Sequence, residues 1–137
     1  MNIWCERVDH ATRLAKQIDR ENFGICFNLY HWLRTDPGGD LRALVREAMP
    51  HLFLVTVNGE LDPPQGPGGL PLGHGGYDVA EFLQPFVEAG YRGPVGLQAV
   101  FWKGDVRENL RQSLRAWNEI SSRLAGAAGP AGEEHPE

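Results

Sequence analysis

Residues 52–58, LFLVTVN, form a run of apolar and β-branched side chains that ends on the amide of Asn58. A strand made from such a run buries both of its faces, which is typical of parallel sheets covered by helices. The stretch therefore predicts a buried parallel strand with a polar residue at its carboxyl end.

Helices and shorter strands are predicted on both sides of this run by the hydrophobic spacing. Asp40 is expected to cap one helix, Pro50 to end it, and capping-box patterns begin at Asp78 and Asp105. The predicted helices cover residues 6–18, 41–48, 79–87 and 106–124, and the predicted strands cover residues 23–28, 52–58 and 94–101. Because strands joined through helices run parallel, we expect an α/β fold with about three parallel strands alternating with four helices.

Three further segments depart from this regular pattern. Residues 59–77 are too rich in Gly and Pro for a helix or a ladder, and loops of this length are usually functional or mobile. Pro85 lies beyond the first turn of its helix, which predicts a kink or a shortened start. We therefore expect one domain over residues 1–124, followed by a disordered tail over residues 125–137, which has little apolar surface.

Composition excludes several classes of protein. Lys and Arg total 13 against 18 for Asp and Glu, so the net charge is -5, and no basic block suited to nucleic acid is present. The apolar runs fall far short of the ~20 residues that span a bilayer, and the N-terminus does not look like a signal peptide. The two cysteines, Cys5 and Cys26, make no metal spacing or disulfide framework, which favours a cytoplasmic protein.

Polar side chains follow each predicted strand at its carboxyl end, where ligands bind in parallel α/β folds. Amides both donate and accept hydrogen bonds, which suits sugar hydroxyls, whereas divalent cations prefer carboxylate and imidazole. The predicted substrate-binding residues are Asn28, His31, Asn58, Gln98 and Trp102.

His31 and Glu60 are the predicted acid/base residues, because imidazole and carboxylate groups exchange protons readily. Each candidate also has a structural interpretation. A single Asn at a strand end often only caps a turn. His31 alternatively packs beside Trp32 and bonds a backbone carbonyl, Glu60 alternatively is solvated, and Trp102 alternatively covers the rim of a barrel.

Nucleotide-binding fingerprints do not follow any predicted strand, since neither GxGxxG nor GxxxxGK[ST] occurs there. Instead, the stretches FNLYHWL, GYRGPVGLQ and SLRAW, together with LFLVTVNGE, are similar to the sugar phosphate isomerase/epimerase family with the xylose-isomerase-like TIM barrel. The similarity runs through nearly all of the predicted helices and strands. It implies a barrel of eight strand–helix units, which needs ~250 residues, so the chain is expected to be a partial barrel, the C-terminal half.

The resemblance also implies a chemistry. Members of the family bind a divalent metal, usually Mn, Mg, Co or Zn, and move a proton between adjacent carbons of a sugar. Matched by motif, the metal-ligand positions fall on Asn28, Thr56 and Gln98, and His31 matches a histidine that contacts substrate. Every one of these ligand positions carries a neutral residue, so the resemblance implies the fold more strongly than the metal site.

Two functions are weighed for a half barrel of this kind. The first is an isomerase or epimerase for a small sugar or sugar phosphate, in which Met1 is an internal start and the chain is truncated. The alternative is a non-catalytic module that binds carbohydrate or a partner. A hydrolase of the same barrel, such as an apurinic-site endonuclease, ranks last because it needs a multi-zinc cluster. Exposed barrel edges are also expected to favour pairing with another copy.

Overall fold

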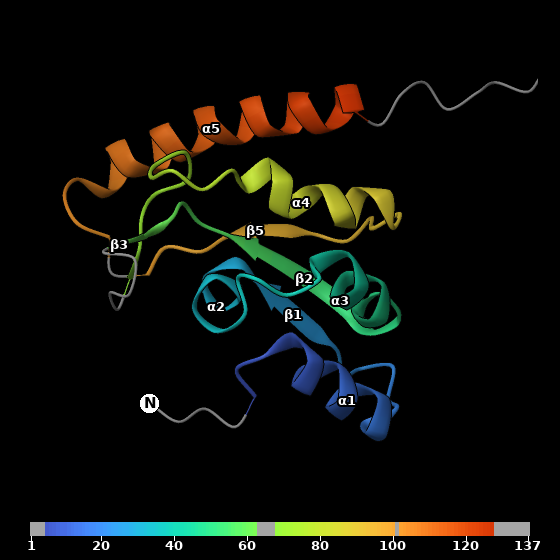
Figure 1. Cartoon of the computed structure of the whole chain (residues 1–137). Helices are drawn as coiled ribbons and strands as arrows, with labels where there is room; N and C mark the ends of the chain where they lie inside the picture. Colours follow the sequence, from blue (N-terminus) through green and yellow to red (C-terminus); the bar gives the residue numbers. More distant parts are fainter. Residues whose placement is uncertain (1–4, 63–67, 101, 128–137) are drawn as a thin grey trace, which may run out of the picture.

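A parallel three-stranded sheet forms the centre of the protein. The computed structural model describes residues 5–62, 68–100 and 102–127. The strands are β1 (Ile25–Asn28), β2 (Leu52–Val57) and β5 (Val95–Leu97), in the order β1-β2-β5 with both pairings parallel. The predicted parallel strand is therefore confirmed and is the middle strand of the sheet (Figure 1). The predicted burial of both of its faces is wrong, since only Val55 and Val57 are buried and Phe53 is 49% exposed.

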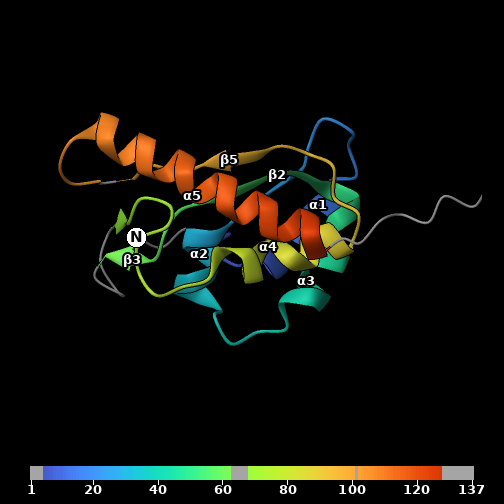
Figure 2. The ribbon, with the colours of Figure 1, turned by 90° about the horizontal axis from the view of Figure 1, so that it is seen from above.

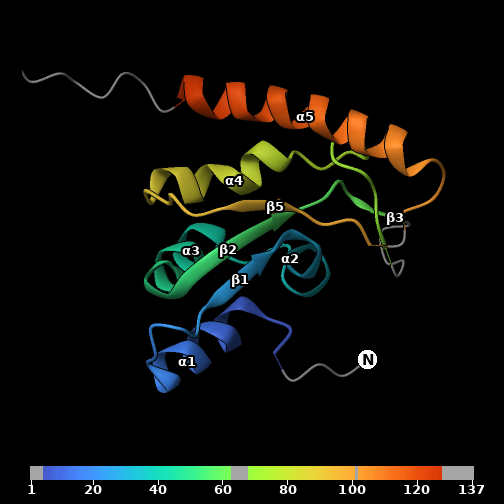
Figure 3. The same ribbon diagram turned by 180° about the vertical axis from the view of Figure 1, so that it is seen from behind.

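The helices lie on one face of this sheet, as Figures 2 and 3 show from above and from behind. They are α1 (Val8–Ile18), α2 (Leu29–Thr35), α3 (Leu41–Ala48), α4 (Val79–Glu88) and α5 (Val106–Ala127), with a 3-10 turn, η1 (Met49–His51), between α3 and β2. Phe27, Val55 and Val57 point to the helices and are buried, whereas Cys26 is exposed. This arrangement is a partial α/β barrel in which no helix of the described ranges covers the second face of the sheet. We call that second face uncovered.

An aromatic cluster joins the sheet to α4. The ring of Phe27 on β1 lies edge-on to Phe86 at 5.1 Å and to Phe82 at 5.7 Å, measured between ring centroids. Phe82 and Phe86 themselves are 5.2 Å apart and are one helical turn from each other. Edge-to-face contacts of this kind stabilise a core beyond the burial of area alone, so this cluster fixes α4 against β1.

Three predicted helix caps are confirmed. The carboxylates of Asp40, Asp78 and Asp105 accept hydrogen bonds from the backbone N–H groups of Ala43, Ala80 and Glu108 at 3.0, 2.9 and 2.8 Å. Each of these carboxylates satisfies an amide that has no partner within its helix. The Glu108 side chain accepts from Gln112 instead of reaching back, so the α5 capping box forms only its Asp half.

The helix α2 is absent from the sequence prediction, so the described residues contain five α-helices where four were expected. Asn28 ends β1 and at once caps α2, because its side chain accepts from the His31 N–H at 3.2 Å. Leu29 and Trp32, three residues apart, are the buried residues of this short helix. A short apolar run after a strand does not reveal its helical period, which explains the omission.

The Gly- and Pro-rich loop contains a short ladder, contrary to the prediction that it holds none. Strands β3 (Leu61–Asp62) and β4 (Gly68–Gly69) pair antiparallel. Gly69 approaches the Asn58 amide so closely that a Cβ at Gly69 would lie 2.9 Å from Nδ2. Because glycine has no side chain, β4 reaches a position that composition alone did not indicate; the loop residues 63–67 lie outside the described residues.

The predicted bounds of β5 and α5 differ from the structure, whereas the predicted start of α4 agrees with it. Strand β5 is shorter than predicted, because Val100 accepts from the Gly69 N–H at 3.4 Å instead of extending the ladder with β2. Helix α4 starts at Val79 as predicted and continues through Pro85, so its start is not shortened. Helix α5 extends to Ala127, so the predicted tail begins too early, and residues 128–137 lie outside the described residues. No helix in the described ranges has both the length and the apolar character that crossing a bilayer requires.

Truncating Phe82 should destabilise the protein strongly, because its ring is fully buried between Phe27 and Phe86. We expect Phe82→Ala to lower the free energy of unfolding by about 3–5 kcal/mol, measured by urea unfolding followed by circular dichroism. Leu114→Ala is the matched control, since Leu114 is 61% exposed. Equal effects of the two substitutions would contradict the assignment of the core.

Acid should weaken the ion pair between α4 and α5. The hydrogen bonds from Arg123, 2.7 and 3.2 Å long, and the bond from the Ala80 N–H lower the pKa of Asp78, although partial burial opposes them. A carboxyl with a lowered native pKa stabilises the fold fully above its ordinary pKa, and this contribution is lost as the pH falls through the native pKa.

We therefore expect the unfolding free energy to fall below about pH 4, the ordinary value for aspartate, and Asp78→Asn to flatten that decline. Urea unfolding between pH 7 and pH 2.5 measures the effect. Asp40→Asn, which alters the cap of α3, is the control. An acid-side decline of the same steepness in Asp78→Asn and the parent protein would show that this ion pair does not contribute.

Candidate functional site

Two predicted ligand residues lie next to each other on the uncovered face of the sheet. In the parallel pairing of β1 with β2, Asn28 is in register with Thr56 and Cys26 with Leu54. Register partners point to the same face, and the Cys26 Sγ lies 3.8 Å from the Thr56 Oγ1. We call this face, which carries Cys26, Asn28 and Thr56, the inner face.

Asn28 has a structural role at the inner face. Its Oδ1 accepts from the His31 N–H at 3.2 Å, which makes it the N-cap of α2. Asn28 therefore makes the contact expected from the structural interpretation, in which an Asn at a strand end caps a local turn. One consequence is that Asn28 fixes the first turn of α2 and thus the backbone of His31.

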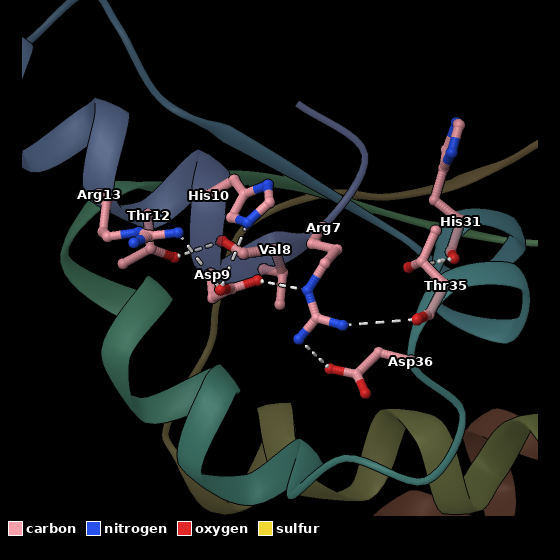
Figure 4. A network of polar contacts seen from close by, with 9 residues as sticks. All are labelled: Arg7, Val8, Asp9, His10, Thr12, Arg13, His31, Thr35 and Asp36. Atoms are coloured by element: carbon pink, nitrogen blue, oxygen red, sulfur yellow. Dashed lines mark hydrogen bonds and ion pairs between the residues drawn. The ribbon is translucent and has the colours of Figure 1, made fainter. Parts of the chain in front are cut away.

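His31 lies in the first turn of α2 and is partly buried. Its ring is edge-on to Tyr30, with centroids 5.5 Å apart, and it lines a small cavity of about 70 Å³ together with Cys26, Asn28 and Arg7. The imidazole points away from the neighbouring network of polar contacts around Arg7 (Figure 4). Asn28 and His31 lie next to each other through the hydrogen bond from the His31 N–H to the Asn28 Oδ1, and both line this cavity.

Glu60 is not brought together with His31. Its Oε2 accepts from the Gly76 N–H at 2.5 Å, and its backbone N–H donates to the His74 carbonyl at 3.0 Å. A Cβ at Gly75 would collide with the Glu60 side chain, so the turn at residues 73–76 wraps closely around this carboxylate. The contacts of Glu60 are those of a loop-organising residue, and it does not line the cavity that His31 lines.

Three buried polar atoms near the carboxyl ends of β2 and β5 have no hydrogen-bond partner within the described part of the chain. They are Oδ1 of Asn58, Oε1 of Gln98 and Nε1 of Trp102. Asn58 is 1% exposed and uses its Nδ2 to donate to the Gly59 carbonyl, while the Gln98 N–H donates to Val57 at 2.8 Å. An unpartnered buried polar atom costs about 1–3 kcal/mol. These two acceptors and one donor are therefore free to bond a polar ligand, although none of the three residues lines the cavity beside His31.

A larger cavity lies on the helical side of the sheet and was not indicated by the sequence. Its volume is about 680 Å³, and Trp32, Tyr77, Arg42 and Arg123 are among its lining residues. Burial raises the pKa of Tyr77, and a hydrogen bond with Trp32 acts against that rise. Arg42 pairs with Glu88 and Arg123 with Asp78, so both cations are neutralised. The lining comes from separated segments and leaves no local motif in the sequence.

The residues at the strand ends do not fit a divalent metal. Asn28, Thr56 and Gln98, where the family resemblance implies metal ligands, are neutral, and the Asn28 Oδ1 is already used in capping. Over residues 5–62, 68–100 and 102–127, no group of three or more His, Cys, Asp or Glu side chains is placed to hold a metal ion. Divalent cations are held by carboxylate and imidazole ligands, so we derive no chemical step through a metal.

Comparisons with known proteins agree on the architecture. A family model described as xylose isomerase-like TIM barrel matches residues 1–120. The structure is similar to that of an L-ribulose 3-epimerase, with a TM-score of 0.66 and 15% identity over 96% of this chain and 47% of that one. It is also similar to D-psicose 3-epimerase from Clostridium cellulolyticum H10 solved with D-tagatose, with a TM-score of 0.57 and 19% identity over 90% of this chain and 41% of that one. At these identities the two structures support the fold alone.

A curated relative is also similar in sequence. The 3-dehydroshikimate dehydratase of Pseudomonas aeruginosa is 29% identical over 126 residues, which cover 85% of this chain and 19% of the relative. The chain thus spans a fifth of this relative and less than half of the two solved structures.

Replacing the neutral residues with ligands should create metal affinity that the protein lacks. We expect the parent chain to retain well below one Mn²⁺ per chain after dialysis, because neutral side chains do not compensate the cation's lost hydration. The triple variant Asn28→Asp, Thr56→His, Gln98→Glu should bind Mn²⁺ more tightly in isothermal titration calorimetry. One Mn²⁺ per parent chain, measured by elemental analysis, would contradict the conclusion that these neutral residues do not fit a divalent metal.

Proposed function

Because the chain belongs to the xylose isomerase-like TIM barrel family, we propose that it forms part of a sugar isomerase or epimerase. The reaction moves a proton between adjacent carbons of a small sugar or sugar phosphate. Because a curated relative is a 3-dehydroshikimate dehydratase, we propose a broader substrate class, a small molecule with several oxygen substituents.

The observation that carries this proposal is the set of unpartnered buried atoms beside β2 and β5. Asn58 Oδ1 and Gln98 Oε1 require donors, and Trp102 Nε1 requires an acceptor. A hydroxyl group is both a donor and an acceptor, so a polyol satisfies all three with one type of group. Gln98 and Trp102 are partly buried as residues, although these two atoms are buried, so the proposal requires their side chains to rotate when a ligand binds.

His31 is the proposed acid/base residue. The unperturbed pKa of an imidazole lies near neutral pH, so a histidine side chain takes up and releases protons there. His31 follows Asn28 by three residues and lines a cavity of about 70 Å³ together with Asn28 and Cys26 of the inner face. Glu60, the other acid/base residue predicted from sequence, is proposed instead to hold the loop over residues 73–76, because Gly76 donates to its carboxylate.

A second candidate function is a non-catalytic module that binds carbohydrate. The observation in its favour is the engagement of Glu60 in the loop, which separates the second predicted acid/base residue from the cavity that His31 lines. This candidate shares the binding residues of the first and lacks the proton transfer. Binding and exchange therefore have to be measured separately.

We further propose a cytoplasmic location and, for this chain alone, self-association. Strands β1 and β5 each have only one paired neighbour in the described sheet, so each presents a free edge. The large apolar side chains of Phe53 and Leu97 are 49% and 41% exposed. Pairing of two copies along these edges would cover backbone groups that are otherwise solvated, and size-exclusion chromatography tests it.

Removing the imidazole of His31 should abolish proton exchange without unfolding the protein. We expect His31→Ala to lose the exchange of sugar C–H hydrogens for deuterium in D2O, followed by NMR with a panel of ketoses and their phosphates. His51→Ala is the control, because His51 lies in η1 before the amino end of β2.

Four outcomes of these measurements test the two candidate functions and the role of His31. Exchange in the parent protein that His31→Ala abolishes supports the isomerase. Sugar binding without exchange in the parent protein supports the binding module. Exchange at the parental rate in His31→Ala excludes His31 as the acid/base residue, and the absence of both binding and exchange contradicts both functions.

A further inference from the structure

We propose that Arg7 is a positioning residue that holds α2 and thereby sets the position of His31 at the inner face. The proposal rests on the proposed function of His31. Arg7 precedes α1, whereas His31 is in the first turn of α2, so the two residues are far apart in sequence. Both line the same cavity of about 70 Å³.

Helix α2 needs anchors from outside itself. It has seven residues, and isolated helices shorter than about 12–15 residues are marginal in water. Its amino end is anchored by Asn28, which accepts from the His31 N–H. The carboxyl end of such a helix leaves carbonyl groups without partners, so a second anchor is needed there.

Arg7 provides that second anchor (Figure 4). Its Nη2 donates to the Asp36 carboxylate at 2.9 Å, and its Nη1 points to the Thr35 carbonyl at 3.5 Å. Thr35 is the last residue of α2, and its carbonyl is one of those with no partner inside the helix. A cation next to the carboxyl end of a helix is also favourable to the helix dipole. Arg7 therefore satisfies both the charge and the hydrogen-bonding need of this helix end.

A third contact fixes the guanidinium to α1. The Nε of Arg7 donates to the Asp9 carboxylate at 3.0 Å, and Asp9 lies in the first turn of α1. The guanidinium group is planar and presents its donors in a fixed fork. It therefore holds α1 and the end of α2 in one geometry. We call these contacts among Arg7, Asp9, Thr35 and Asp36 the Arg7 bridge.

The bridge continues to His31 through α2. The hydroxyl of Thr35 donates to the His31 carbonyl at 2.8 Å, one helical turn away. The backbone of His31 is thus bonded at both of its polar groups: its N–H donates to Asn28 and its carbonyl accepts from Thr35. Loss of the bridge frees the carboxyl end of α2, and the resulting movement of the helix displaces the imidazole from the inner face.

Arg13 offers a matched control. Its guanidinium also pairs with Asp9, at 3.6 Å, but its position in α1 is more exposed, and no contact joins it to α2 in the described chain. Arg7→Gln and Arg13→Gln remove the same charge and one Asp9 contact each. Only the first breaks the link between α1 and α2.

The test follows the His31 ring directly by NMR of the full chain, using the Cε1–Hε1 cross-peak. We expect Arg7→Gln to shift or broaden that cross-peak, while those of His51 and His74, which lie outside the bridge, stay in place. Arg13→Gln should leave all three unchanged. Because the measurement needs no sugar, a shift of the His31 signal without sugar binding supports the bridge and contradicts only the proposed function.

Arg7→Lys covers the case in which Arg7→Gln fails to fold. A lysine keeps the charge but does not donate to Asp9, Thr35 and Asp36 at once, so the His31 signal should move less than in a folded Arg7→Gln and more than in Arg13→Gln. An unmoved His31 cross-peak in folded Arg7→Gln overturns the proposal. If only Arg7→Lys folds, an unmoved cross-peak in that variant overturns it as well.

Discussion

The packing of Phe27 against Phe82 and Phe86 is the constraint on which the position of the candidate site depends. These rings lie 5.1–5.7 Å apart and join β1 to α4. Side chains alternate between the two faces of a strand, so turning Phe27 into this cluster turns Cys26 and Asn28 to the opposite face. The burial of Val55 and Val57 does the same for Thr56 on β2. The core therefore decides which polar residues reach the inner face.

Much of this architecture follows from periodicity and caps. The apolar run that forms β2 and the aspartates that begin α3, α4 and α5 are local signals in the sequence. The carboxylates of these aspartates bond amides within a few residues, whereas β2 pairs with the distant strands β1 and β5. Helix α2 was not predicted because tertiary contacts hold it. Its residues Leu29 and Trp32 pack into the core, and Arg7 donates to Asp36 at its carboxyl end. The β3–β4 ladder was missed for the same reason, since Gly69 gains its place by packing on Asn58.

The candidate site shows a similar division. Asn28 and His31 are neighbours because Asn28 ends β1, His31 follows it by three residues, and the Asn28 Oδ1 accepts from the His31 N–H. Sequence does not reveal whether a polar atom already has a partner. The Asn28 Oδ1 is used by the His31 N–H and the Glu60 Oε2 by Gly76, whereas the Asn58 Oδ1 has no partner in the described chain. Those differences come from loop geometry that the residue types do not encode.

The charges of the described residues determine how well they support the two parts of the proposed function, sugar binding and proton transfer. Proton transfer next to a carbonyl develops negative charge on oxygen, which a metal ion or a set of preorganised donors stabilises. Asn28, Thr56 and Gln98 are neutral where the family resemblance implies metal ligands, and the orphan atoms of Asn58 and Gln98 are acceptors, which bind hydroxyl groups but repel an oxyanion. Trp102 Nε1 is the donor of this set. These three atoms thus suit hydrogen bonding to a neutral polyol better than stabilisation of an enediolate. The described residues support sugar binding directly, whereas catalysis requires hydrogen-bond donors in addition to these three residues.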